Sequence, residues 1–203
     1  MTTNQILATV EMASLVILPL ILFYQRSSWT RRDYLISVIL LPIIWFSTYA
    51  LLHEISHMIG AYWVGLKIID YRLIPEFWKG DFSHAWVNTS AWNSFQGFVV
   101  LLSPYLRDIL FLITGLVILE RQKSRHAFVA GLIYVMFFLS PLFDLANNFS
   151  GYVIEKYGDF NALSFLIGSS WAYTIGLAFS GIAILLVLGV LSRYKGLPGK
   201  PVL

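Results

Sequence analysis

Five long apolar stretches divide the sequence, at about residues 6–24, 34–64, 98–119, 127–147 and 171–191. Each reaches the length of about 20 residues that a helix needs to cross a bilayer, where backbone polar groups must hydrogen-bond within the segment. Charged residues make up 12% of the chain, whereas soluble domains contain about 25%. The sequence therefore predicts an all-α polytopic membrane protein of about five transmembrane helices. We expect one membrane-embedded domain over residues 1–203, located in the cell membrane.

The second apolar stretch is longer than a straight span requires, and Pro42 is expected to bend it. The segment that follows has a different character, because residues 66–73 and 81–87 are rich in aromatic and β-branched residues. A proline and a glycine lie between these two runs. We therefore expect a small membrane-associated β-hairpin between the second and third transmembrane helices. His84 lies on its second arm, where an interfacial role is expected rather than metal binding.

The composition excludes several kinds of site. The chain has no cysteine, so a disulfide, a thiolate nucleophile and a cysteine-ligated zinc are impossible. Its net charge of +3 is small, and the basic residues cluster at the ends of the apolar stretches. This distribution is typical of membrane topology signals and not of a nucleic-acid-binding surface. The lipid bilayer is thus an expected partner, and nucleic acid is not.

The second stretch contains His53-Glu54-x-x-His57. Residues four apart on an α-helix share one face, so the two imidazoles can bind one Zn²⁺. Glu54 lies beside them as a candidate general base. Ionisable groups within an apolar span are costly, which favours a functional interpretation. The alternative is a polar helix end whose histidines only satisfy backbone groups.

A catalytic zinc usually has three protein ligands and one open position, and no third histidine follows His57 at a known spacing. The remaining candidates are Asp108, Asp144 and Asp159. Asp144 is predicted as the third ligand because it lies near the end of a span, after Pro141. Asp159 is next, because its turn with the preceding glycine could fold back over the site.

Two groups of polar residues accompany these carboxylates. Asn147 and Asn148 follow Asp144 at i+3 and i+4 and share its helix face, so Asn148 can orient the carboxylate. Arg107 and Asp108 are adjacent within the third stretch. Because sequence neighbours do not face each other on a helix, we expect these two charges to have separate partners, with Asp108 paired to another helix.

The arrangement resembles the site-2 protease family of intramembrane zinc metalloproteases. The motifs that carry the resemblance lie between residues 47 and 148, in an expected core of about residues 35–148. The His53-Glu54-x-x-His57 run is similar to the first motif of that family, and residues 66–87 to its membrane-associated β segment. Ser103-Pro104 stands where the family typically has Gly-Pro followed by Asn. Asp144 stands where the family has the Asp of Leu-Asp-Gly.

The resemblance implies a Zn²⁺ ion held by His53, His57 and Asp144, with Glu54 as the general base on zinc-bound water. The expected activity is hydrolysis of peptide bonds in a membrane-protein substrate. The candidates for stabilising the oxyanion are Asn147, Asn148 and Arg107.

The chain departs from the family pattern at three places: Ser56 replaces a common glycine, Arg107 replaces the Asn after Gly-Pro, and residues 145–147 replace a glycine-rich run. An alternative is therefore a non-catalytic metal-binding membrane protein of the same fold, with a regulatory or binding role. A metal or proton transporter is disfavoured because few polar residues lie in the other spans. The presence of Glu54 favours the enzyme, because a structural zinc site needs no base.

Overall fold

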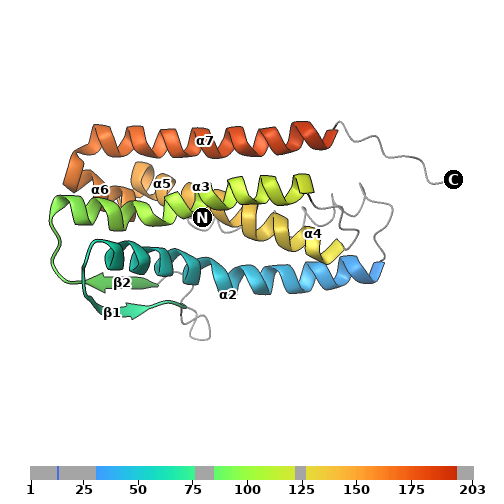
Figure 1. The fold of residues 1–203 in the computed structure, drawn as a ribbon, viewed down its shortest axis with the longest axis horizontal. Coiled ribbons are helices and arrows are strands. Elements are labelled where there is room, and N and C mark those ends of the chain that lie inside the picture. The colour runs from blue at the N-terminus through green and yellow to red at the C-terminus, as the bar shows by residue number, and fades with distance from the viewer. Residues whose placement is uncertain (1–12, 14–30, 76–84, 122–126, 196–203) are drawn as a thin grey trace.

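The computed structural model describes residue 13 and residues 31–75, 85–121 and 127–195. The helices and strands are α2 (Arg31–Trp63), β1 (Ile68–Arg72), β2 (Trp86–Thr89), α3 (Ser94–Arg121), α4 (Ala127–Tyr134), α5 (Ser140–Ser150), α6 (Asp159–Ile167) and α7 (Ser169–Lys195). In Figure 1 the long helices run side by side, and the hairpin and α6 lie at the same end of the bundle. The C-terminal end of α2 and the N-terminal ends of α3 and α7 therefore meet near α6.

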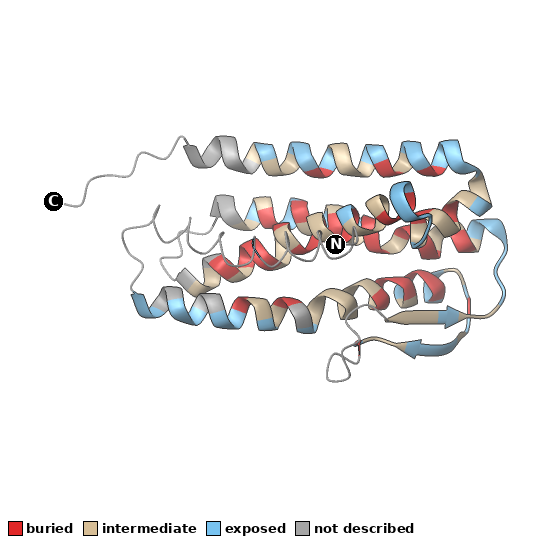
Figure 2. Cartoon of the chain, turned by 180° about the vertical axis from the view of Figure 1, so that it is seen from behind, coloured by how far each residue is buried: buried red, intermediate tan, exposed pale blue. Residues whose placement is uncertain are grey.

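Among the described residues, four helical segments are long and apolar enough to cross a membrane: Ile39–Trp63, Ser94–Ile118, Gly131–Glu155 and Ser169–Gly189. They correspond to the second to fifth predicted stretches. The first predicted stretch, at residues 6–24, lies outside the described residues. Much of the apolar surface of α7 faces outward, as Figure 2 shows, which suits contact with lipid.

The fourth span differs from its prediction. The predicted stretch ends at about residue 147, but the helix continues through Ser150 and then through a π-helical turn, Gly151–Glu155. A second π-helical turn, Val135–Leu139, joins α4 to α5 just before Pro141. Proline has no backbone N–H, and a local π-helical adjustment can re-satisfy the backbone groups that a proline leaves free in a membrane helix. The apolar helix is therefore one irregular span, and the true connector is only residues 156–158.

This short connector reverses the chain. Lys156 and Gly158 both have positive φ, at 56° and 81°, so the backbone turns sharply before α6 begins. Phe160 then lies fully buried, with its ring 4.6 Å from that of Tyr105 on α3 and 5.5 Å from that of Phe149 on α5. These contacts fix the first turn of α6 against the bundle, and they place the adjacent Asp159 over its interior.

The predicted hairpin is present, with β1 and β2 antiparallel. Arg72 pairs with Trp86, and the guanidinium lies 4.3 Å from the centroid of that indole ring. The second strand, Trp86–Thr89, overlaps the end of the predicted arm at residues 81–87, of which residues 81–84 lie outside the described residues. His84 lies outside the described residues.

Candidate metal centre

Helix α2 presents the two predicted histidines on one face, as their i, i+4 spacing requires. Their ring centroids are 4.8 Å apart, and His53 Nε2 lies 3.1 Å from His57 Nε2. Glu54 is buried on the same turn and interacts electrostatically with both imidazoles. The helix is continuous from residue 31 through Pro42, so the predicted bend does not interrupt the motif.

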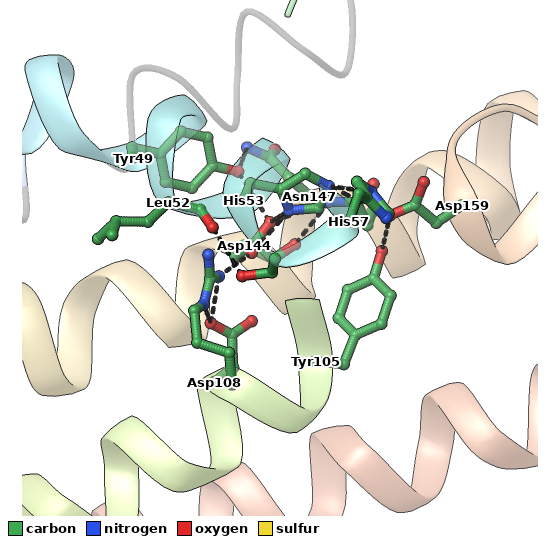
Figure 3. A network of polar contacts seen from close by, with 12 residues as sticks. Tyr49, Leu52, His53, His57, Tyr105, Asp108, Asp144, Asn147 and Asp159 are labelled. Atoms are coloured by element: carbon green, nitrogen blue, oxygen red, sulfur yellow. Dashed lines mark hydrogen bonds and ion pairs between the residues drawn. The ribbon is translucent and has the colours of Figure 1, made fainter. Parts of the chain in front are cut away.

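Asp159 completes the group. Its Oδ2 lies 3.2 Å from His53 Nε2 and 3.3 Å from His57 Nε2, and the Tyr105 hydroxyl donates to the same oxygen at 2.8 Å. Figure 3 shows this carboxylate reaching the imidazoles from α6 while Tyr105 approaches from α3. Burial alone would raise the pKa of Asp159, but when the imidazoles are protonated, the charge of His57 and hydrogen bonds from both imidazoles hold that pKa far below its usual range.

His53, His57 and Asp159 form a group that could hold a metal ion. Three ligand atoms at 2.0–2.1 Å from a tetrahedral metal would lie about 3.3 Å from one another. The separations of 3.1, 3.2 and 3.3 Å are close to that value. The three ligand atoms therefore have the spacing of a tetrahedral metal site. The fourth coordination position would be left for another ligand.

The other nitrogen of each imidazole is engaged away from this triangle. His53 Nδ1 lies 2.8 Å from the Asp144 carboxylate, and His57 Nδ1 lies 2.8 Å from the Val100 carbonyl oxygen. Both partners are acceptors, so each Nδ1 must carry a proton and donate it. In neutral imidazoles, both Nε2 lone pairs then point into the triangle. This is the tautomer that a metal ligand needs, and an acceptor on the distal nitrogen is its usual support.

Asp144, predicted as the third ligand, lies on the far side of His53 from the triangle. It is 1% exposed and binds Arg107 as well as His53. Asn148 donates to its Oδ1 at 3.1 Å, which is the orienting contact that the sequence suggested. The geometry thus favours Asp159 as the metal-ligating carboxylate and gives Asp144 the role of holding His53. The sequence ranked these two residues in the reverse order.

The expectation of separate partners for Arg107 and Asp108 is wrong. Arg107 donates from both Nε and Nη2 to Asp108 Oδ1, and from Nη2 to Asp144 Oδ2. The rule that neighbours do not meet describes side-chain directions at Cβ, whereas a long arginine side chain can fold back along its own helix. Asp108 is 2% exposed and is therefore a buried partner of a bridging guanidinium.

The three candidate oxyanion donors are not equally placed. Arg107 binds two carboxylates, although its Nη1 is buried without a hydrogen-bond partner among the described residues. Asn148 donates to both the backbone and the side chain of Asp144. Asn147 donates to the Tyr49 hydroxyl at 3.4 Å, and Figure 3 labels both residues in the polar network. A hydrogen bond of that length is weak.

Tyr105 and Val100 contribute directly to the centre, and sequence reasoning did not identify either of them. Both lie on α3 within five residues of Pro104. Tyr105 had a weak signal, because a tyrosine beside buried charges in an apolar span needs a hydrogen-bond partner. A backbone carbonyl such as that of Val100 leaves no signal in its own residue type.

No protein-family model matches the chain, and no curated protein or solved structure is significantly similar to it. The function must therefore be inferred from the residues themselves.

Proposed function

We propose that the chain is an intramembrane zinc endopeptidase, a divergent relative of the site-2 proteases. One observation carries the proposal: His53, His57 and Asp159 direct three ligand atoms at one point, with both imidazole protons held on the opposite side. A proton on one Nε2 could form a hydrogen bond within one pair of these atoms. A cation at the centre could bind all three atoms at once.

Charge balance supports a bound divalent ion. Among the described residues, four carboxylates lie in or against this buried network, against one guanidinium, that of Arg107. The carboxylates are Glu54, Asp108, Asp144 and Asp159. With neutral imidazoles the formal charge is −3, and a dication would reduce it to −1. Uncompensated charge is costly inside an apolar bundle, so a cation stabilises the arrangement that the side chains already adopt.

Glu54 supports catalysis over a purely structural ion. A zinc ion at this centre would supply Lewis acidity and activate water at neutral pH. Glu54, buried beside both ligands, is placed to accept the proton from the attacking water and to deliver it to the leaving amine. Tyr105 and Asp144 hold the ligands, and Asn147, Asn148 and Arg107 are the candidates for stabilising a developing oxyanion.

The hairpin supports a polypeptide substrate. A helical peptide bond has its carbonyl engaged, so a membrane-spanning substrate must unwind before it is cleaved. In the part of the chain that the structure describes, β1 and β2 form a two-stranded sheet, so each strand has one unpaired backbone edge. An extended substrate segment can add to such an edge by strand pairing. Ile69 and Tyr71 on β1 are exposed apolar side chains suited to that contact.

The test compares metal content and proteolysis of the full chain in lipid vesicles. The unaltered protein should retain about one zinc per chain and cleave a membrane-spanning peptide library. Glu54→Gln should keep the metal and lose cleavage, because glutamine preserves shape but accepts no proton. Glu155→Gln, a change of the same kind at an exposed position, is the control and should leave both unchanged. Metal retention without cleavage by any form would favour the non-catalytic alternative, and absence of metal would refute the centre.

A further inference from the structure

Helix α3 contains a proline at position 104, and the effect of this proline on the backbone falls on the metal centre. In an α-helix the N–H of residue i donates to the carbonyl of residue i−4. Proline has no N–H, so the carbonyl of Val100 receives no such bond from position 104. The proline ring also crowds that carbonyl and tilts it off the helix axis. Pro104 therefore leaves one backbone acceptor on α3 open to a neighbouring helix.

The donor that occupies this acceptor is His57. Its Nδ1 lies 2.8 Å from the Val100 carbonyl oxygen, and both residues are buried. Buried acceptors are costly when unpaired, so the freed carbonyl and the imidazole N–H satisfy each other. This hydrogen bond holds the proton on Nδ1 and turns Nε2 toward His53 and Asp159.

A glycine makes this contact between the two helices possible. Gly60 follows His57 by about one turn of α2, and a Cβ at that position would lie 3.2 Å from the Val100 Cα and 2.1 Å from the Ser103 Oγ. The absence of a side chain at Gly60 lets the backbones of α2 and α3 approach at the level where His57 needs a backbone partner. The close approach of α2 and α3 at Gly60 and the Val100 carbonyl that Pro104 leaves free thus occur at the same level of the bundle.

We infer that Pro104 is a positioning residue of the metal centre, acting through the Val100 carbonyl to fix His57 in its metal-binding tautomer and orientation. The inference rests on the proposed metal site but adds a residue that touches neither the metal nor the substrate. Changes to such outer partners of metal-ligating histidines typically lower metal affinity about 10- to 100-fold.

The decisive comparison changes only the presence of an N–H at position 104. Pro104→Ala supplies a donor to the Val100 carbonyl, whereas Pro104→lactic acid has the same methyl side chain but an ester oxygen in place of the N–H. We expect zinc affinity, measured by chelator competition on the full chain in vesicles, to fall about tenfold or more in the alanine form. The lactic acid form should bind more tightly than the alanine form and approach the unaltered chain.

A second variant weakens the same acceptor while leaving the proline intact. Replacing Leu101 by its α-hydroxy acid converts the Val100 carbonyl into an ester carbonyl, which is a poorer acceptor. This change should also lower zinc affinity. The same replacement at Leu110, an exposed position on the same helix, is the control and should not. Cobalt-loaded protein provides a readout of geometry, because its visible absorption bands should shift in the alanine and Leu101 variants.

Three outcomes would overturn the inference. Equal losses in the alanine and lactic acid forms would assign the effect to the lost proline ring and not to the carbonyl. Unchanged affinity and unchanged cobalt spectra in the alanine form and in the Leu101 variant would show that His57 needs no such partner. An unaltered chain that binds no metal would refute the metal centre and this inference together, whereas metal binding insensitive to these changes would refute this inference alone.

Discussion

The sharpest prediction concerns two aspartates that contact His53 from opposite sides. Asp159 approaches Nε2 at 3.2 Å, and Asp144 lies 2.8 Å from Nδ1. If Asp159 is the metal ligand and Asp144 only orients the imidazole, the same substitution should have different consequences at the two positions. We therefore compare Asp159→Asn with Asp144→Asn, because each exchange preserves the size of the side chain and removes its charge.

The size of each effect follows from the contacts. Asparagine at 144 still offers an amide oxygen to Nδ1, but it replaces a hydrogen bond to a charged group, about 1.5–3 kcal/mol, by a neutral one of about 0.5–1.5 kcal/mol. The midpoints of these ranges differ by about 1.3 kcal/mol, which corresponds to a nearly tenfold loss of zinc affinity. Asparagine at 159 removes an anionic ligand from the ion itself, so the loss should exceed the roughly 100-fold upper range for outer partners.

The assay is chelator competition for zinc on the full chain in vesicles, with thermal unfolding followed in parallel. Asp144→Asn also takes one of two carboxylates from Arg107, so it should lower stability more than Asp159→Asn lowers it in the metal-free protein. Asp108→Asn is the matched control, because it perturbs the same guanidinium without touching an imidazole. A chain that keeps its zinc as Asp159→Asn but loses it as Asp144→Asn would refute the geometric assignment and restore the order suggested by sequence.

Three further changes probe the support of the centre. Tyr105→Phe removes the hydroxyl that donates to Asp159 and should weaken zinc binding about tenfold, as chelator competition would reveal; an unchanged affinity would contradict that role. Arg107→Gln leaves two buried carboxylates without their cation and should cost about 3–5 kcal/mol in stability, and combining it with Asp108→Asn should recover part of the loss in unfolding measurements. Gly60→Ala places a Cβ against α3 and should cost about 1–3 kcal/mol by the same measurement; wild-type stability would show that the helices can separate freely.

The parts of the structure that the sequence predicted depend only on residues that lie close together in the chain. The i, i+4 spacing of His53 and His57 determines their common face, and the lengths of the apolar stretches predict the four membrane-length helices that the structure describes. The hairpin was predictable because two short runs rich in aromatic and branched residues are separated by a proline and a glycine. In each of these cases the pattern and its structural consequence lie within one element, so no knowledge of packing was needed.

Choosing between Asp144 and Asp159 as the candidate third ligand required knowledge of the path of the chain between helices. The preference for Asp144 came from its depth in a span, and that depth is real, since Asp144 does reach His53. The sequence could not reveal the sharp reversal at Lys156 and Gly158, nor the burial of Phe160 that holds α6 against the bundle. These contacts bring Asp159 from outside the apolar span to the Nε2 side of the histidines. A positive φ at a lysine has no reliable sequence signature, so the reversal was visible only as a possible glycine turn.

The departures from the site-2 protease pattern can be understood as one linked change. Arg107 stands where the resemblance has an asparagine, and it binds Asp144, which stands where the resemblance has a metal-ligating aspartate. A carboxylate that neutralises a buried guanidinium, accepts from His53 and receives Asn148 has both oxygens occupied. It therefore has little capacity left for a metal ion, and the anionic ligand must come from elsewhere. Under the proposed function Asp159 would meet that need, because the loop that follows the longer fourth helix turns it back to the open side of the two imidazoles. If Asp159 is the metal ligand, a guanidinium at position 107 and a ligand at position 159 are mutually dependent, and an Arg107→Asn change should free Asp144 to compete with Asp159 for the ion.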